Sequence, residues 1–237
     1  MNDYTVSAPD ILTLTPIARI HTDFPEKFGI PRQSGMVSSL QATITFEGEC
    51  KNPDCVRDLQ AFSHLWLIWG FSAHTSSGWS PTVRPPRLGG NTHTGVFASR
   101  SPFRPNPLGL SSVRLTQVET DGPHGPVLHV SGADLMDGTP IYDIKPYLPF
   151  TDSHPDASAS FTARALRHTL TVHCDPSLLS RIRSKRQEAL LEILSLDPRP
   201  AYQSDPSRVY GMRFDQYTIR FTVDGQELHV TEILPAL

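Results

Sequence analysis

The pattern of apolar and polar residues in the first 150 positions of the chain predicts mainly strands. In residues 40–46 apolar residues alternate strictly with polar ones, which is the pattern of a strand with one face in the core. Further strands are expected at residues 11–22, which are rich in β-branched residues, and between Gly, Pro and Asp turns at 95–99, 108–119, 127–132 and 141–147. The uniformly apolar run 62–71 predicts a central strand buried on both faces. Because the strands follow one another without long helices, we expect a mainly β fold, a single-sheeted antiparallel β-barrel.

The apolar spacing lengthens to that of a helix in the last third of the chain. After a short strand at 169–172, Asp175 can cap a helix that has Pro176 at its first position. The apolar stripe of this helix comprises Leu178, Leu179, Ile182, Ala189, Leu190, Ile193 and Leu194. A hairpin of strands 217–223 and 228–234 around an Asp224-Gly225 turn completes a small α+β unit. A shorter helix is expected after Asn52, running to Phe62.

These patterns divide the chain into three parts. Residues 1–150 form the barrel, which we expect to bind a cofactor, and the small polar residues that follow indicate a linker at 151–168. Residues 169–237 form the C-terminal α+β domain, a possible contact for tRNA. A unit of about 70 residues is marginally stable by itself, so we expect it to dock on the barrel.

Charge and cysteine content exclude several classes of protein. The net charge of -3 excludes a globally basic nucleic-acid binder, so contact with RNA must come from local patches. The three cysteines lack zinc-site spacing, so we expect reduced thiols and no metal. The N-terminus lacks the features of a signal peptide and no apolar run is long enough to span a bilayer, so we expect a cytoplasmic protein without membrane contact.

The stretch from residue 79 to residue 110 carries the main chemical signal. It holds six prolines, which exclude a helix, and between Leu59 and Val118 there are five arginines but no aspartate or glutamate. Guanidinium groups on a stiff loop suit a carboxylate or a phosphate. The alternative is a proline-rich surface linker, but a solvated linker would normally mix its charges.

Several long motifs resemble the TsaA-like/TrmO family of tRNA methyltransferases. They are FSHLW at 62–66, RPPR at 84–87, RSPFRPNPLG at 100–109, DGTPIYDIKPY at 137–147 and DPRPAY at 197–202. The resemblance implies a homodimeric β-barrel enzyme with a small C-terminal domain. It implies that this enzyme uses S-adenosyl-L-methionine to methylate the exocyclic N6 of threonylcarbamoyladenosine, beside the anticodon of threonine tRNA.

The same resemblance implies which residues contact the cofactor. They are Pro31, Arg32, Gln33, His64, Leu65, Arg100, Leu110, Ser131, Gly132, Ala133 and Asp134. These positions supply the arginines and apolar side chains that a cofactor with a carboxylate and an adenine needs. Methylation of an amide-like nitrogen also requires loss of a proton, and the candidate catalytic residues are Asp143, Lys145 and Tyr147, or else Asp134.

Each of these assignments has a structural alternative. Asp143 and Lys145 share a face of a strand and can form a surface ion pair. Asp134 can cap a turn, and His64 can be a hydrogen-bonded core histidine. Trp66 and Trp69 suit a core better than a stacking surface. The basic residues 181–186 suit a solvated helix face, although they could bind phosphate.

Two other functions are compatible with the residues. The first is a non-catalytic β-barrel that binds S-adenosyl-L-methionine or RNA as a regulatory ligand. The second is a phosphate-ester hydrolase that uses the same arginines. The lack of a metal-ligand cluster or a Ser/Cys nucleophile motif in the sequence argues against the second.

Overall fold

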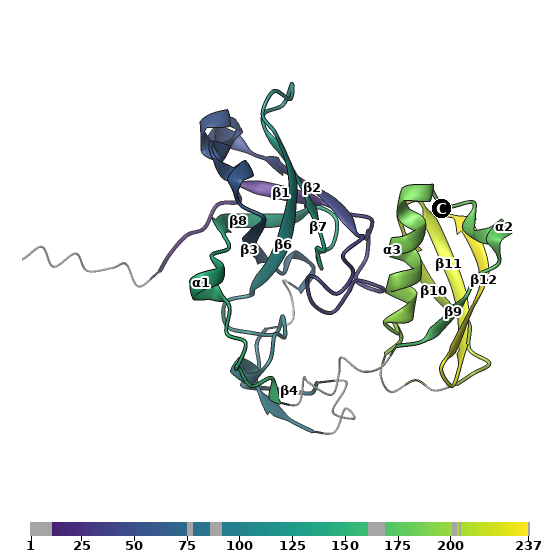
Figure 1. The fold of residues 1–237 in the computed structure, drawn as a ribbon. Coiled ribbons are helices and arrows are strands. Elements are labelled where there is room, and N and C mark those ends of the chain that lie inside the picture. The colour runs from purple at the N-terminus through teal and green to yellow at the C-terminus, as the bar shows by residue number, and fades with distance from the viewer. Residues whose placement is uncertain are drawn as a thin grey trace, which may run out of the picture.

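The protein contains a closed barrel of six antiparallel strands and a separate C-terminal sheet (Figure 1). The computed structural model describes residues 11–74, 78–85, 92–160, 169–200, 203 and 205–236. The strand order around the barrel is β1-β2-β7-β6-β3-β8. The strands are β1 (Ala18–His21), β2 (Gln41–Phe46), β3 (His64–Gly70), β6 (Leu108–Glu119), β7 (Val127–Ser131) and β8 (Thr139–Pro146). The predicted mainly β barrel is therefore confirmed.

The expected first strand at 11–22 is much too long. Strand β1 pairs only from Ala18, opposite Phe46, to His21, opposite Thr43. Ile11 and Leu12 are 82% and 75% exposed and lie outside the barrel wall, whereas Ile17, directly before β1, packs against the barrel core. In this segment the β propensity of the residues is not matched by a partner strand.

The prediction that 62–71 is buried on both faces is wrong. In β3 the side chains of Leu65 and Leu67 are fully buried, whereas those of His64, Trp66 and Ile68 are half-buried. A barrel has one packed interior, so alternate residues of each strand must point outward. The uniform apolar run therefore reflects an apolar outer surface next to β3.

Two smaller predictions are also wrong in type. The expected strand at 95–99 is the two-residue β5 (Thr94–Gly95), which pairs with β4 (Thr82–Val83) outside the barrel and precedes the 3-10 turn η6 (Val96–Ala98). The helix expected after Asn52 is a series of 3-10 turns, namely η1 (Gly48–Lys51), η2 (Pro53–Val56) and η3 (Leu59–Ala61). Asn52 does cap η2, because its side chain accepts a hydrogen bond from the Asp54 N–H at 3.0 Å.

The C-terminal sheet has the order β10-β11-β12-β9, with β9 parallel to β12. Its strands are β9 (Thr171–His173), β10 (Tyr210–Phe214), β11 (Tyr217–Asp224) and β12 (Glu227–Pro235). Strand β10 was not expected, and the hairpin turn follows Asp224 rather than beginning with it. The single predicted helix is two helices, α2 (Pro176–Leu179), which Asp175 caps as expected, and α3 (Ser184–Ser195).

Three parts of the interpretation lie outside the described residues. They are residues 86–87 of the RPPR motif, the second part of the expected linker at 161–168, and the end of the DPRPAY motif at 201–202. At the boundary between the barrel and the expected linker lies a short helix, α1 (Pro149–Asp152). The 3-10 turn η4 (Ser72–His74) follows β3. Among the described helices there is none with the length and apolar character needed to cross a bilayer.

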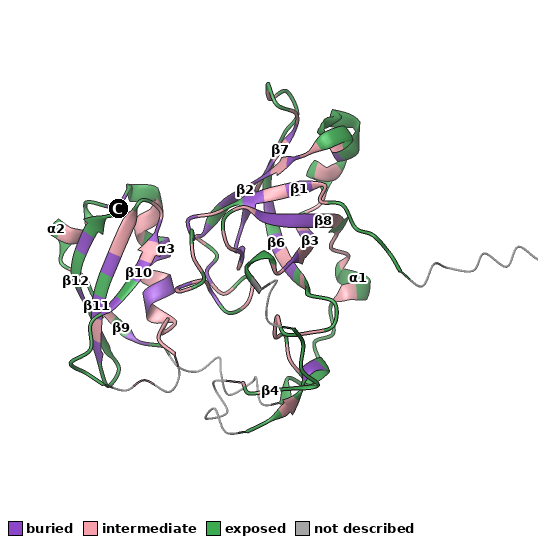
Figure 2. Ribbon diagram, turned by 180° about the vertical axis from the view of Figure 1, so that it is seen from behind, coloured by how far each residue is buried: buried purple, intermediate pink, exposed green. Residues whose placement is uncertain are grey.

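Two hydrophobic cores are present, one inside the barrel and one between α3 and the C-terminal sheet (Figure 2). The loop between β1 and β2 contributes Phe24, Val37 and Leu40 to the C-terminal core. The Phe24 ring packs edge-on against Phe214 with 5.8 Å between ring centroids. A loop that leaves the barrel therefore completes the core of the other unit.

Gly29 tests how closely this loop fits the C-terminal core. Gly29 has a φ of +97°, and a Cβ added there would lie 2.1 Å from Sδ of Met212, which is fully buried and has little room to move. We expect Gly29→Ala to lower the free energy of unfolding by about 1–3 kcal/mol more than Gly35→Ala does. Gly35 in the same loop also has a positive φ, +77°, but its Cβ would meet no atom within 4 Å. Equal losses in denaturant unfolding would contradict this close fit.

Candidate functional site

Strand β6 extends beyond its neighbour β7 at one end of the barrel. The ladder between β6 and β7 ends at the pair Arg114–Ser131, whereas the ladder between β6 and β3 continues to Leu108. Two loop segments follow this extended edge. The Ser112 N–H donates to Ser34 Oγ at 3.2 Å, and the Gly35 N–H donates to the Gly132 carbonyl at 2.8 Å. The segments 31–35 and 131–134, which the resemblance assigns to the cofactor, are thus neighbours here.

Asp134 lies at the centre of this arrangement. Its Oδ1 accepts a hydrogen bond of 2.6 Å from the hydroxyl of Ser111, a buried side chain of β6. The Trp69 indole N–H in turn donates to Ser111 Oγ at 3.0 Å. A Cβ on Gly109 would lie 2.3 Å from the Trp69 ring, so glycine at this position allows the indole to lie across β6. The hydrogen bonds from Trp69 through Ser111 therefore fix the position of the Asp134 carboxylate.

Burial raises the pKa of Asp134 above its ordinary value. The hydrogen bond from Ser111, those from the main chain at Asp134 and Ser34, and the positive charge of Arg100 all act in the opposite direction but are outweighed. A carboxylate whose pKa is raised is a stronger base than one in water. Asp134 thus combines a fixed position with an increased tendency to accept a proton.

Residues 79–110, which contain no aspartate or glutamate and are called the acid-free stretch below, approach the same end of the barrel through Arg100. Its Nη1 donates to Gln33 Oε1, and the Gln33 amide donates to the carbonyl of Arg32 at 2.5 Å. Near the start of β6, the Phe71 N–H donates a hydrogen bond of 3.0 Å to the Pro107 carbonyl, which holds the end of the acid-free stretch against the end of β3. The guanidinium of Arg100 is exposed and near the carboxylate of Asp134, where an anionic group could reach it.

Pro31 and Arg32 lie at the junction with the C-terminal unit. Pro31 is buried, and Arg32 Nη2 is 3.4 Å from the carbonyl oxygens of both Asp197 and Arg199. Arg32 therefore already bonds to the chain beyond α3. Of the two predicted arginines, Arg100 is the one that bonds Gln33 and whose positive charge acts on the pKa of Asp134.

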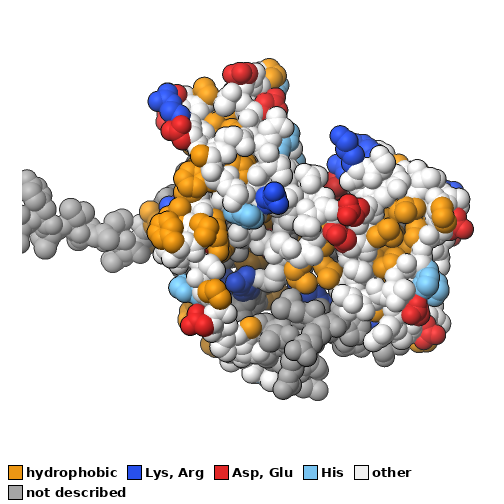
Figure 3. Space-filling model, in the orientation of Figure 1, with side chains coloured by type: hydrophobic (Ala, Val, Ile, Leu, Met, Phe, Trp, Pro, Cys, Tyr) orange, Lys and Arg blue, Asp and Glu red, His pale blue; other side chains and the backbone are white. Residues whose placement is uncertain are grey.

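Most of the other predicted residues lie on or beside β6, β3 and β8. Leu110 and Asp143 flank Ile68 in the strand register, and residues paired in this way share one face of a sheet. On the face shown in Figure 3, hydrophobic side chains gather on the barrel, with basic and histidine side chains between them. Leu110 is exposed on the outer face of the barrel.

Asp143 and Lys145 form the surface ion pair that was the alternative to a catalytic role. The Lys145 Nζ lies 2.8 Å from Asp143 Oδ2, and the two side chains are 62% and 44% exposed, respectively. Such a pair contributes about 0–1 kcal/mol to stability. Their catalytic role stays a prediction.

His64 and Leu65 are the first two residues of β3, and Tyr147, directly after β8, lies beside them. The His64 Nδ1 lies 2.9 Å from Ser63 Oγ, and its ring centroid lies 6.1 Å from that of Tyr147. The side chain of Leu65 is fully buried in the barrel core, so only its main chain can contact a ligand. Trp66 lies against Tyr147 at 5.5 Å, and its indole N–H donates to Asp152 at 2.8 Å.

The structure thus divides the predicted residues among three places. Gln33, Arg100 and 131–134 meet at the extended edge of β6, and Pro31 and Arg32 lie at the domain junction. The rest lie on or beside β6, β3 and β8, with the side chain of Leu65 inside the barrel core. Ser34, Trp69 and Ser111 were missed, and the only signal for them was the polar pair Ser111-Ser112 within an apolar strand. Among the described residues, no group of three potential metal-ligating side chains comes together.

Comparisons with known proteins cover both parts of the chain. Residues 19–153 match the family model for the tRNA-methyltransferase O N-terminal domain, and residues 167–236 match that for the TrmO C-terminal domain. The chain is 40% identical over 227 residues to an Escherichia coli K12 protein named tRNA (adenine(37)-N6)-methyltransferase. The match covers 92% of this chain and 96% of that protein.

Pseudomonas aeruginosa provides a similar sequence and a similar solved structure. A protein of that organism named a putative S-adenosylmethionine-dependent methyltransferase is 37% identical to this chain, and the match covers 85% of this chain and 88% of that protein. A crystal structure of TrmO from Pseudomonas aeruginosa has a TM-score of 0.75 and 29% identity, and the match covers 94% of this chain and 98% of that one.

The raised pKa of Asp134 predicts an effect on stability with a definite sign. Below the ordinary pKa of aspartate the carboxyl is protonated in both the folded and the unfolded protein. As the pH rises through the raised pKa, the folded protein must ionise a buried group, and stability falls. We therefore expect Asp134→Asn to have a higher Tm than the parent at pH 7–8, with the gain shrinking toward pH 4.

Thermal unfolding across this pH range measures the effect. The control is Asp143→Asn, which loses only an exposed ion pair and should not raise the Tm at pH 7–8. A lower Tm for Asp134→Asn at pH 8 would show that the hydrogen bonds to this carboxylate outweigh its burial.

Proposed function

Because the chain belongs to the tRNA-methyltransferase O family, we propose that it transfers a methyl group from S-adenosyl-L-methionine to N6 of adenine 37 in tRNA. The observation that carries this proposal is the meeting of Gln33, Arg100 and Asp134 beside the extended edge of β6. These side chains come from three distant parts of the sequence. Their meeting puts a cationic fork and a base within one small region.

The residues at this edge fit the proposed methyl donor. S-Adenosyl-L-methionine has a carboxylate, an ammonium group, a sulfonium and an adenine, and supplies the methyl group when bound. Arg100 can pair with the carboxylate, the Gln33 amide and nearby main-chain groups can bond the polar atoms, and exposed Leu110 offers an apolar surface. The barrel holds these groups in place, and such positioning contributes strongly to transfer reactions.

Asp134 is the proton acceptor that we favour. The target nitrogen carries a hydrogen that must leave when the methyl group is added, and a buried carboxylate with a raised pKa can take it. Asp143 stays a candidate, but it is solvated and paired with Lys145. Tyr147 and Lys145 complete the DGTPIYDIKPY motif and are proposed to line the substrate side.

The acid-free stretch suits the approach of an anticodon loop. Trp79, which precedes Arg84 in the chain, is 56% exposed, and Phe97, which precedes Arg100, is 80% exposed. Proteins that bind RNA loops stack unpaired bases on aromatic rings and pair phosphates with arginines. We propose that the substrate is threonine tRNA carrying threonylcarbamoyladenosine, that the enzyme is a homodimer, and that it acts in the cytoplasm, where mature tRNA is found.

Labelled methyl transfer tests the proposed function directly. Purified protein is incubated with methyl-labelled S-adenosyl-L-methionine and threonine tRNA with or without the threonylcarbamoyl group, and the nucleosides are identified by mass spectrometry. We expect N6-methylation of the modified tRNA and little of the unmodified one. Tight binding of both ligands without transfer would instead favour the non-catalytic regulatory barrel.

Substitution of Arg100 is expected to weaken cofactor binding. A hydrogen bond to a charged group contributes about 1.5–3 kcal/mol, so Arg100→Ala should raise the Kd for S-adenosyl-L-methionine by about 10- to 100-fold. Arg57→Ala is the matched control, because Arg57 is an exposed arginine whose partner is the neighbouring Asp54. Calorimetric titration measures both, and equal affinities for the two variants would remove Arg100 from the site.

The two aspartates are separated by their effects on turnover. If Asp134 accepts the proton, Asp134→Asn should lower kcat by about 10²- to 10⁴-fold and leave the Kd for the cofactor nearly unchanged. Asp143→Asn should retain most of the activity. The reverse result would transfer the role to Asp143.

A further inference from the structure

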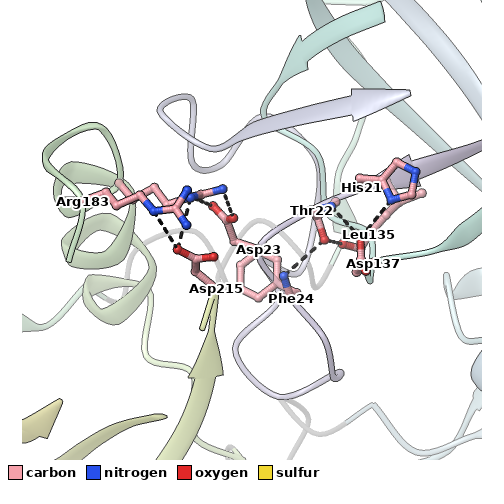
Figure 4. Close-up of polar contacts among 9 residues, drawn as sticks. His21, Thr22, Asp23, Phe24, Leu135, Asp137, Arg183 and Asp215 are labelled. Atoms are coloured by element: carbon pink, nitrogen blue, oxygen red, sulfur yellow. Dashed lines mark hydrogen bonds and ion pairs between the residues drawn. The ribbon is translucent and has the colours of Figure 1, made fainter. Parts of the chain in front are cut away.

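A buried group of charges joins the barrel to the C-terminal unit (Figure 4). Arg186 of α3 forms two bonds with Asp23 of the β1–β2 loop, from Nε to Oδ2 at 2.8 Å and from Nη2 to Oδ1 at 2.6 Å. Its Nη1 also donates to Asp215 Oδ2 at 3.1 Å, in the turn between β10 and β11. The Asp23 side chain is only 6% exposed, so this pairing is not a surface contact.

The same short segment is bonded to the residues that follow Asp134. Thr22 Oγ1 donates to the Leu135 carbonyl at 3.0 Å, and the Thr22 N–H donates to Asp137 Oδ1 at 3.1 Å. The Asp137 N–H donates to the Phe24 carbonyl at 2.8 Å. Residues 22–24 are therefore held on one side by α3 and on the other by the chain that carries Asp134, as Figure 4 shows.

The far end of the β1–β2 loop has a second set of contacts with the C-terminal unit. Ser39 Oγ donates to Glu192 Oε2 at 2.5 Å, and Val37 and Leu40 belong to the C-terminal core. Between these two anchored ends lie Gln33 and Ser34, which contact Arg100 and the edge of β6. The loop thus spans from one unit to the other across the proposed site.

We propose that Arg186 is a positioning residue for the cofactor: by holding Asp23 against α3, it fixes the loop that carries Gln33 and Ser34 and the segment that carries Asp134. This inference rests on the proposed function. The C-terminal unit then sets the affinity of the barrel for S-adenosyl-L-methionine, in addition to any contact with RNA. Loss of Arg186 leaves the buried Asp23 carboxylate without its main partner, so the loop would move to reach water.

The neighbouring basic residues support this structural use of the helix. Arg181 donates from Nη1 to the Ile233 carbonyl at 2.8 Å, and Arg186 is occupied by two carboxylates. Arg183 is mostly exposed, and its Nε is 3.8 Å from Asp215. The basic cluster at 181–186 is therefore partly committed to internal contacts, which leaves less of it for phosphate than the sequence suggested.

The test uses Arg186→Gln in the full chain, with Arg183→Gln on the same helix as the control. We expect Arg186→Gln to raise the Kd and the KM for S-adenosyl-L-methionine by about 10-fold or more, as expected when hydrogen bonds to a charged group that order a site are lost. The KM for tRNA and the kcat at saturating cofactor should change less than about threefold. Hydrogen exchange of the amides of residues 33–35 and 132–135 should become faster. Arg183→Gln should change neither the Kd for the cofactor nor these exchange rates.

Two further variants keep the test decisive. Asp23→Asn combined with Arg186→Gln removes the buried charge at position 23 and should recover part of the affinity, as should Arg186→Lys, which restores the positive charge. If Arg186→Gln does not fold, Arg186→Lys alone is compared with the parent by the same titration and exchange. Unchanged cofactor affinity, or a rise in the KM for tRNA alone, would overturn the inference. Failure of the parent itself to bind the cofactor would instead overturn the proposed function.

Discussion

The extended end of β6 is the constraint on which the rest of the site depends. In a closed barrel every strand has a neighbour on each side, so main-chain groups are occupied and loops have no edge to join. Because β7 pairs only as far as Ser131 while β3 continues along β6 to Leu108, one side of β6 is available at this end. The loops before β2 and after β7 bond there, and Ser111 and Ser112 provide the polar groups that hold them.

Burial at this edge links local structure to chemistry. Ser111 is a buried polar residue beside a mainly apolar barrel core, and it is hydrogen-bonded on both sides, to Trp69 and to Asp134. Buried polar groups are tolerated when they are bonded in this way. The free energy lost by burying the Asp134 carboxyl appears as its raised pKa, so the same feature that lowers stability makes a stronger base.

The two units are joined through residues that belong to both. Phe24 leaves the barrel and enters the C-terminal core, while Asp23 beside it pairs with Arg186. An apolar contact and a bidentate ion pair from adjacent residues fix both the position and the orientation of the loop. This arrangement explains how a small C-terminal unit can matter to a site formed mainly by the barrel, because the loop that completes the site is not held by the barrel alone.

The local sequence by itself determined the features that depend on near neighbours in the chain. The alternating pattern predicted β2 and β6 almost to the residue, and Asn52 and Asp175 were correctly identified as caps, because side-chain polarity and a capping hydrogen bond act within a few residues. The family motifs indicated Gln33, Arg100 and Asp134 as candidates. Only the tertiary structure decided what required a distant partner: that β1 begins at Ala18, that one face of β3 is only half-buried, and that Ser111 bonds Asp134. The tertiary structure alone also decided that Arg186 pairs with Asp23 instead of facing solvent. Pairing and burial depend on which residues far apart in the chain come into contact.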